Sequence, residues 1–322
     1  MALSLNLLDQ LSADKNIFVA FSGGLDSTAL LFLCNQALIA KKIKNLKAIH
    51  INHNLSQNSD KWQHHSESFC KTHNINFESF SIKVSKQRSS VESQARQARY
   101  HMFENILNEN DQILLAHHRD DVFETILLRL FRGTGDDGLS GLNERRLLGK
   151  GEIIRPFLDI PKSDLKDFIH SHDLPYVEDD TNENNAFDRN FLRNEIIPAL
   201  DKRWIKLSER VSFTSQTAKK KKLSLDFMLE KNFQNEVSSG VIDRESFSKT
   251  PSFVIEELIR LILRKKNIAS PNQRVLSEIM NVFFYKKPSH ESYVKWSRKD
   301  GEQSGGEVFS EHDEIIFKKN NL

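Results

Sequence analysis

The stretch FVAFSGGLDSTALLFL, residues 18–33, limits the possible folds more than any other, because a turn rich in glycine and hydroxyl groups joins two apolar runs. The pattern predicts a buried strand over residues 17–21 and a helix from Thr28. A simple chain reversal is one interpretation. The other is a phosphate site, since a glycine-rich turn before a helix exposes backbone N–H groups at the positive end of the helix dipole.

The side chains of this turn favour the phosphate site. Ser22, Ser27 and Thr28 add hydroxyl donors. Asp26 adds a carboxylate that would repel phosphate unless a divalent cation lies between them. The lysine of the GxxxxGK[ST] loop and the GxGxxG spacing of dinucleotide folds are both missing.

The first half of the chain alternates short apolar runs with helical patterns, which is typical of a doubly wound α/β domain with a mostly parallel sheet. In such folds ligands gather at the carboxyl ends of the strands. The expected strands cover residues 17–21, 46–51, 76–81 and 112–116, and the expected helices cover residues 28–40, 60–73, 90–108 and 120–131.

The second half of the chain is mainly helical and charged. A helix is expected to start near Pro161, another to run from Arg189 to near Pro198, and amphipathic helices to cover residues 253–264 and 272–284. The tail, residues 293–317, resembles a small hairpin around Gly301, Gly305 and Gly306. We therefore expect two domains, a catalytic domain over residues 1–208 and a smaller helical domain over residues 209–322 that ends in a hairpin.

Composition points to the cytoplasm. Cys34 and Cys70 are isolated and form no CxxC pair, so neither a disulfide framework nor a cysteine-rich metal site is expected. The N-terminus lacks the pattern of a secretory signal, and the apolar runs are too short to span a membrane. Residues 193–222 hold nine basic and three acidic residues and end in Lys219, Lys220, Lys221 and Lys222. Such a stretch indicates either a solvated helix face or a surface that contacts RNA phosphates.

Two further stretches carry candidate nucleotide contacts. Ile51 and His53, in HINHNL, end the second expected strand, where an adenosine would lie in a doubly wound fold. Arg96 and Arg99 follow Glu92 on one helix face. They form either a solvated ion pair with Glu92 or a bidentate polyphosphate contact.

An acidic cluster follows the fourth expected strand. His117 ends that strand, and Asp121 and Glu124 follow at four and seven residues, so these three side chains are expected to share one face. Zinc is not favoured, because HExxH is missing. One interpretation is an N-capped helix with Asp120 or Asp121 in its first turn. The other is a site for a cationic substrate.

Taken in order, SGGLDS, HINHNL, ARQARY, LLAHHRDDVFET, RGTG, GLSGL, IIRPFLDIPKSDL and DDTNENNAFDRNFLRNEIIP resemble the motifs of the tRNA(Ile)-lysidine synthetase family of PP-loop ATP pyrophosphatases. The resemblance covers residues 18–200 and is weaker beyond. We expect the sequence to lack the further C-terminal domain of longer members, and tRNA contacts of the kind made by that domain therefore stay open.

The resemblance implies ATP, Mg²⁺, L-lysine and the isoleucine tRNA with a CAU anticodon. Cytosine O2 is adenylated first, and the lysine ε-amine then attacks C2 and displaces AMP. A base must first take the proton of that amine, and its identity stays open. A homodimer also stays open, and no membrane partner is expected. A PP-loop tRNA thiolase, an amide-forming ligase and a noncatalytic nucleotide-binding module are the alternatives, although Cys34 and Cys70 offer no obvious catalytic pair for thiolation.

The same resemblance implies the residue roles. Asp26 would hold Mg²⁺, and the catalytic residues would be Asp26, His117, Asp121 and Arg193. Lysine would be handled by His117 and Asp121 with Glu124 in support, and tRNA by Arg189, Arg193, Lys219, Lys220, Lys221 and Lys222. The residues expected to bind ATP are Ser22, Gly23, Gly24, Leu25, Asp26, Ser27, Ile51, His53 and Arg96.

Overall fold

The computed structural model describes residues 3–12, 14–54, 56, 58–82, 91–289, 292–297 and 304–320, without the side chains of residues 91–93, 136, 180 and 181. The chain forms two compact units. The first comprises Met1–Ser85 with Ala98–Lys220, and the second comprises Lys86–Gln97 with Lys221–Leu322. The expected division near residue 208 stays a prediction.

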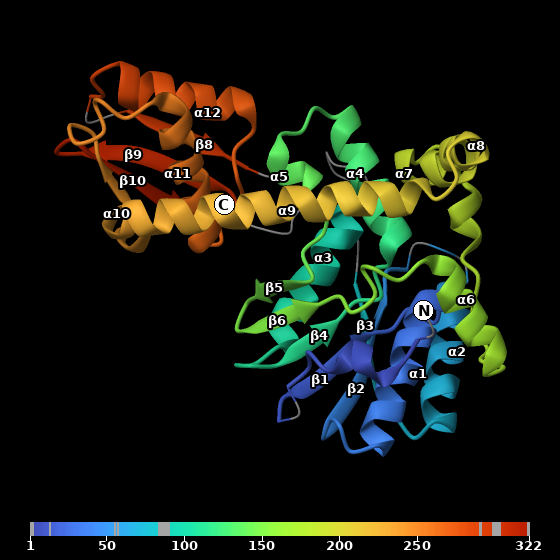
Figure 1. The fold of residues 1–322 in the computed structure, drawn as a ribbon. Coiled ribbons are helices and arrows are strands. Elements are labelled where there is room, and N and C mark those ends of the chain that lie inside the picture. The colour runs from blue at the N-terminus through green and yellow to red at the C-terminus, as the bar shows by residue number, and fades with distance from the viewer. Residues whose placement is uncertain are drawn as a thin grey trace. The chain divides into compact units, whose positions relative to one another are not determined.

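The first unit is built on a six-stranded sheet in the order β3-β2-β1-β4-β6-β5, in which every neighbouring pair is parallel except β5 with β6 (Figure 1). This confirms the doubly wound α/β fold. In chain order the strands are β1 (Asn16–Ala20), β2 (Asn45–Asn52), β3 (Asn76–Ser81), β4 (Gln112–Leu114), β5 (Arg145–Leu148) and β6 (Gly151–Ile154).

Helices cover both faces of this sheet. Ile17 and Val19 of β1 pack into one apolar core with α1 and α6, while Phe18 and Ala20 pack against a second core under α3, because successive strand residues point to opposite faces. The helices of this unit are η1 (Leu5–Leu8), α1 (Leu25–Ile39), α2 (Ser59–Thr72), α3 (Val91–Ile106), α4 (Arg119–Phe131), α5 (Asp136–Leu139), α6 (Lys162–Ser171), η2 (Asp180–Glu183), α7 (Asp188–Phe191), η3 (Leu192–Ile196) and α8 (Ile197–Arg203). Helix α3 belongs to this unit from Ala98 onward.

The structure adds one hairpin to this unit and lengthens one of the helices expected in it. The β5–β6 hairpin was not expected, because its charged residues Arg145 and Arg146 hide the strand pattern. The helix that starts at α7 does not end near Pro198 but continues to Arg203. The π-helical turn η3 directly precedes α8, where Pro198 occupies the first turn, and a first-turn proline loses no internal hydrogen bond.

The second unit combines helices with a four-stranded antiparallel sheet in the order β7-β10-β9-β8. Its core contains Ile259 and Phe283 from the helices and Val308 and Phe317 from the sheet. Its elements are α10 (Gln234–Ser239), β7 (Val241–Asp243), α11 (Ser252–Lys265), α12 (Gln273–Ile279), η4 (Met280–Tyr285), β8 (Tyr293–Trp296), β9 (Gly306–Glu311) and β10 (Glu314–Lys319).

The closing hairpin is present, but its tight turn lies elsewhere than expected. His312 and Asp313, both with positive φ of 48° and 64°, join β9 to β10. Such a two-residue turn suits the twist of an antiparallel pair. Gly305 and Gly306 lie at the start of β9, and Gly301 lies outside the described residues.

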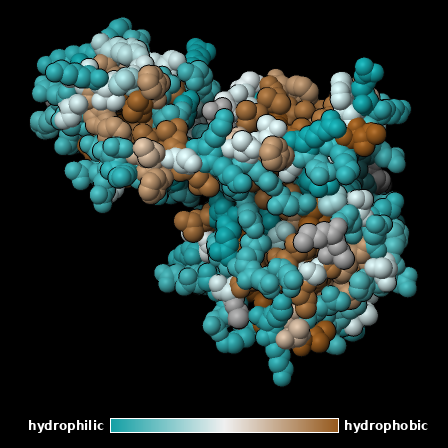
Figure 2. Space-filling model, in the orientation of Figure 1, coloured by the Kyte–Doolittle hydropathy of each residue, from teal (hydrophilic) through white to brown (hydrophobic). Residues whose placement is uncertain are grey.

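Helix α9 (Leu207–Asn232) is the longest element, with 26 residues, and belongs in part to each unit. Figure 2 shows hydrophilic side chains over much of the visible surface, interrupted by separate hydrophobic patches. Large exposed apolar side chains on α9 include Phe213, Leu223 and Phe227. Among the described residues, no helix combines the length and the apolar character that crossing a bilayer requires.

Candidate active site

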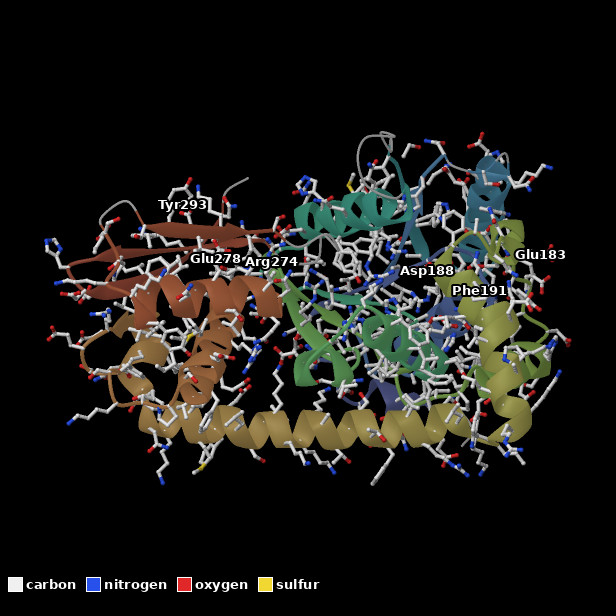
Figure 3. The ribbon with its side chains drawn as sticks, turned by 90° about the horizontal axis from the view of Figure 1, so that it is seen from above. Glu183, Asp188, Phe191, Arg274, Glu278 and Tyr293 are labelled. Carbon is white, nitrogen blue, oxygen red and sulfur yellow. The ribbon has the colours of Figure 1, made fainter. Side chains whose placement is uncertain are left out.

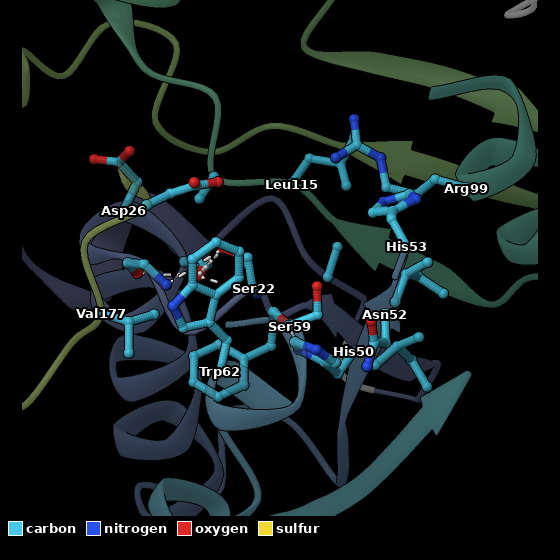
Figure 4. Close-up of a pocket in the computed structure, with 18 of the residues that line it drawn as sticks. Ser22, Asp26, His50, Asn52, His53, Ser59, Trp62, Arg99, Leu115 and Val177 are labelled. Atoms are coloured by element: carbon cyan, nitrogen blue, oxygen red, sulfur yellow. Dashed lines mark hydrogen bonds between the residues drawn. The ribbon is translucent and has the colours of Figure 1, made fainter. Parts of the chain in front are cut away.

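A cavity of about 500 Å³ lies in the first unit at the carboxyl ends of β1, β2 and β4 (Figure 4). It brings together many of the residues singled out in the sequence. Those that line it are Ser22, Gly24, Asp26, Ser27, Ile51, His53, Arg99, His117 and Asp121. Trp62 of α2 and Val177 also line it, and neither carried a sequence signal of its own.

The β1–α1 loop has the form that phosphate binding requires. Helix α1 begins at Leu25, three residues before the expected start, so Gly24 is its N-cap. Ser22 Oγ lies 3.0 Å from Ser27 Oγ, and Ser27 Oγ donates to Gly24 O at 3.0 Å. These bonds hold the loop around the amino end of α1, where backbone N–H groups attract anions.

Gly23 is required by the geometry of this loop. Its φ is +82°, a conformation that residues with a Cβ rarely adopt. A Cβ at this position would also lie 2.8 Å from Ser66 Oγ and 3.2 Å from Val177 Cγ2. The loop therefore packs closely against α2, and Gly23 and Leu25 shape it without lining the cavity.

Asp26 has one oxygen available for a cation. Its Oδ2 lies 3.6 Å from His118 Nε2, whereas its buried Oδ1 has no hydrogen-bond partner among the described residues. Burial would raise the pKa of Asp26, but the neighbouring His118 outweighs it and lowers the pKa. The described residues contain no cluster of three or more His, Cys, Asp or Glu side chains able to hold a metal. One free carboxylate oxygen fits Mg²⁺, which takes few protein ligands and completes its shell with substrate phosphates and water.

His118 is the main residue that the sequence reasoning missed. It is 1% exposed and is the N-cap of α4, where its backbone N–H donates to Asp121 Oδ2 at 2.9 Å. Burial would lower its pKa, but Asp120, Asp121 and Asp26 outweigh this effect and raise the pKa to about 10. Carboxylates lie within 3.6 Å of both ring nitrogens. We therefore assign both nitrogens as donors, and the 3.4 Å approach of Asp121 N to Nδ1 as a contact without a hydrogen bond.

The expectation of a shared face for His117, Asp121 and Glu124 is corrected, because α4 starts only at Arg119 and His117 lies outside its helical periodicity. The expected N-capped helix is confirmed, because His118 is the N-cap of α4 and both Asp120 and Asp121 lie in its first turn. Asp120 accepts from the backbone N–H of Lys162 at 2.8 Å, which ties the start of α4 to α6.

The acidic cluster is paired with arginines rather than open. Arg189 Nε donates to Glu124 Oε2 at 2.6 Å, and Arg193 Nε donates to Glu124 Oε1 at 2.7 Å. Arg189 also donates to Asp121 Oδ1 at 3.0 Å. Glu124 has 2% of its side chain exposed and does not line the cavity, whereas Asp121 does. Two acids and two arginines thus join α4 to the segment from α7 to η3.

Arg96 and Arg99, the two arginines of α3, differ in whether they line the cavity. Arg99 lines the cavity, whereas Arg96, which the resemblance assigned to ATP, does not. Burial and then the charges of Arg99 and His50 lower the pKa of His53 to about 4. His53 is therefore neutral at pH 7 and suits an uncharged part of a nucleotide.

The lysine run lies on α9 and spreads around it. Successive residues of a helix are rotated by 100°, so Lys219, Lys220, Lys221 and Lys222 cannot all face one side. Lys220 and Lys221 are exposed, and Lys219 is half-buried. Lys219 lines a second cavity of about 320 Å³ with Ser212, Ser215 and Arg155.

A parallel strand, an SGGLDS loop and a helix whose amino end faces the cavity together define a PP-loop domain. The sequence profile described as PP-loop domain matches residues 3–200. A tRNA(Ile)-lysidine synthase of Wigglesworthia glossinidia brevipalpis is 36% identical over 87% of this chain and 72% of its own length. The chain belongs to the tRNA(Ile)-lysidine synthase family of PP-loop proteins.

Other relatives extend beyond the chain. A tRNA(Ile)-lysidine synthase of Legionella pneumophila strain Lens is 32% identical over 88% of this chain, which spans 65% of the length of that relative. Among solved structures, the U34-tRNA thiolase NcsA from Methanococcus maripaludis with its [4Fe-4S] cluster aligns with a TM-score of 0.53. The two are 17% identical over 65% of this chain and 74% of the thiolase, a likeness of fold alone.

Proposed function

We propose that this protein uses ATP to ligate L-lysine to C2 of the wobble cytidine in the isoleucine tRNA with a CAU anticodon. The observation that carries the proposal is the single cavity that Asp26 of the phosphate loop shares with His117 and Asp121. Together with the family membership, it supports a site in which an activated cytidine and an amine meet.

The first half of the reaction is assigned to the β1–α1 loop. Cytosine O2 attacks the α-phosphorus of ATP, the bond to the β-phosphate oxygen breaks, and diphosphate leaves. The N–H groups at the start of α1 would bind the leaving diphosphate. Asp26 would hold Mg²⁺ through Oδ1, and the bound cation would neutralise phosphate charge. Ile51, neutral His53 and Trp62 would border the nucleoside.

The second half is assigned to the other side of the cavity. The lysine amine attacks C2 and loses a proton, the C2–O2 bond breaks, and AMP leaves. Asp121, which lines the cavity, would attract the lysine ammonium. Glu124 would contribute indirectly, because it binds Arg189 and Arg193 and so fixes their positions. These two arginines would face the reacting phosphate or the tRNA. Lys219–Lys222 would contact the tRNA backbone.

The buried thiols argue against the thiolase alternative. Burial raises the pKa of both Cys34 and Cys70, the latter to about 12, so neither is a ready thiolate. The amide-forming ligase and the noncatalytic module remain as outcomes of the test. A location in the cytoplasm and a homodimer stay predictions.

The test is incubation of the protein with ATP, Mg²⁺, radiolabelled lysine and a CAU isoleucine tRNA transcript. We expect label in the RNA, with one AMP and one diphosphate per lysine. A transcript with uridine at the wobble position is the matched control and should stay unlabelled. Diphosphate release without label in RNA, sulfur transfer in place of lysine, or ATP binding without turnover would each overturn the proposal.

A further inference from the structure

Arg155, the residue after β6, is a buried cation without an acidic partner. It is 2% exposed, and among the described residues no carboxylate lies within ion-pair distance of it. Its guanidinium donates instead to His117 Nδ1 at 3.2 Å from Nε, to Asn143 O at 2.7 Å and to Tyr100 Oη at 3.4 Å. A buried charge usually has a counter-ion, so this residue needs an explanation other than charge pairing.

The contact with His117 fixes where that ring carries its proton. Arginine has five N–H donors and no acceptor, so His117 Nδ1 must offer a lone pair. A neutral imidazole with an acceptor at Nδ1 carries its hydrogen on Nε2. If His117 Nδ1 were also protonated, its N–H would point at the Nε–H of Arg155, and two donors would repel each other.

We propose that Arg155 is a positioning residue that holds His117 as the neutral Nε2–H tautomer, and that His117 is therefore not the base for the attacking amine. The second clause rests on the proposed function, whereas the tautomer does not. A ring with Nδ1 engaged by Arg155 and hydrogen on Nε2 has no lone pair with which to take the amine proton. His117 serves the site as a hydrogen-bond donor, and another group takes the proton.

His50 provides an internal comparison, because it lines the same cavity and its Nδ1 lies 2.9 Å from the carbonyl oxygen of Phe21. A carbonyl only accepts, so His50 carries hydrogen on Nδ1. Burial lowers the pKa of His50 despite this bond, so the ring is neutral at pH 7. The two histidines should thus show opposite tautomers in one protein.

The direct test is long-range ¹H–¹⁵N correlation NMR on the whole chain with ¹⁵N-labelled histidine, with signals assigned from His117→Asn and His50→Asn. We expect a protonated Nε2 for His117 and a protonated Nδ1 for His50 at pH 7. Hydrogen on Nδ1 of His117 would overturn the proposal. This measurement needs no substrate, so its outcome is separate from that of the lysine assay.

Variants test the role in the reaction. Arg155→Met should lower kcat for lysine incorporation by about tenfold to a hundredfold with little change in the KM for ATP, because the ring is no longer held. Arg155→Lys keeps an N–H donor at this position. It should therefore show a higher kcat than Arg155→Met and the same His117 tautomer as the wild type. Arg145→Met, on the exposed side of neighbouring β5, is the matched control and should change neither. A folded Arg155→Met variant with the kcat of the wild type would exclude the positioning role. If that variant does not fold, the NMR spectrum of the wild-type protein still decides the tautomer of His117.

Discussion

At the residue scale, His118 and Asp26 link the start of α4 to the phosphate loop. His118 lies between Asp26, Asp120 and Asp121, so a buried cation sits behind the carboxylate that would hold Mg²⁺. Sequence reasoning weighed the acids of this segment but not the second histidine. The contact between His118 and Asp26 arises only because β1 and β4 lie side by side, and their paired residues, such as Ile17 and Gln112, are 95 positions apart in the sequence.

His118 makes stability depend on pH. Its pKa is raised in the folded protein, so its contribution is complete below about pH 6.5 and is lost as the pH rises toward about 10. In that window the free energy of unfolding should fall by about 1.4 kcal/mol per pH unit more in the wild type than in His118→Asn. Asparagine keeps an N-cap without the titration. Urea unfolding at pH 6, 8 and 10 measures the difference, and parallel curves for the two proteins would contradict the assignment.

Asp26→Ala should reduce lysine incorporation by at least about a hundredfold, because the carboxylate for the cation and the charge next to the diphosphate are lost. The fold should be retained, since Asp26 is partly exposed in the first turn of α1. Circular dichroism and the labelled-lysine assay check both statements. Asp14→Ala, at an exposed carboxylate, is the control. Normal incorporation by the Asp26 variant would remove the metal role.

At the element scale, the strands and helices that carry strong periodicity could be predicted, and the irregular connections could not. Strands β1 to β3 lie within one residue of the expected ranges, because each is a short apolar run between polar turns. The β5–β6 hairpin was missed because β5 begins with two consecutive arginines, Arg145 and Arg146, and because its turn depends on Gly149. Glu124 was identified, but its burial between two arginines depends on how α7 packs on α4.

The β1–α1 loop should not tolerate a side chain at Gly23. Gly23→Ala should destabilise the protein by about 1–2 kcal/mol from the left-handed φ alone, and the contact with Ser66 adds to this. It should also weaken ATP binding, because the loop must shift away from α2. Urea unfolding and ATP titration measure the two effects. Gly135→Ala, where a Cβ would meet nothing within 4 Å, should change neither.

The α4–α7 junction depends on Glu124. Glu124→Gln removes the most deeply buried acid of this cluster and leaves Arg189 and Arg193 with Asp121 as the remaining acid of the cluster. It should destabilise the protein by about 2–4 kcal/mol, less than the loss of a fully buried pair because the arginines are partly exposed. Asp188, labelled on α7 in Figure 3, pairs with Arg132 at the surface. Asp188→Asn should therefore change stability by less than about 0.5 kcal/mol. Equal losses in the two variants would show that burial does not set the strength of this junction.

At the scale of the whole molecule, the charge of α9 is the feature that concerns RNA. The sequence identified the lysine run, and the helix shows why it cannot act as one patch, since four successive side chains point in four directions. Only one or two of them can approach the same stretch of phosphate backbone.

Replacing Lys219–Lys222 with alanine should raise the KM for tRNA and hardly change that for lysine. The slope of log Kd for tRNA against log salt should fall by about one or two rather than four, because each phosphate contact contributes about one. Filter binding over a salt series gives this slope. Lys42→Ala, which removes a lysine paired with Asp9, is the control. An equal rise in the KM for lysine would remove the assignment to RNA.

Both cysteines of the sequence lie in the interior of the first unit, where Cys34 and Cys70 belong to the same apolar core. A thiol reagent in solution can reach them only when that core opens. The rate of labelling under native conditions therefore measures how often the nucleotide-binding unit unfolds. ATP that binds the native form should slow this labelling, which would reveal ligand affinity without an enzymatic assay.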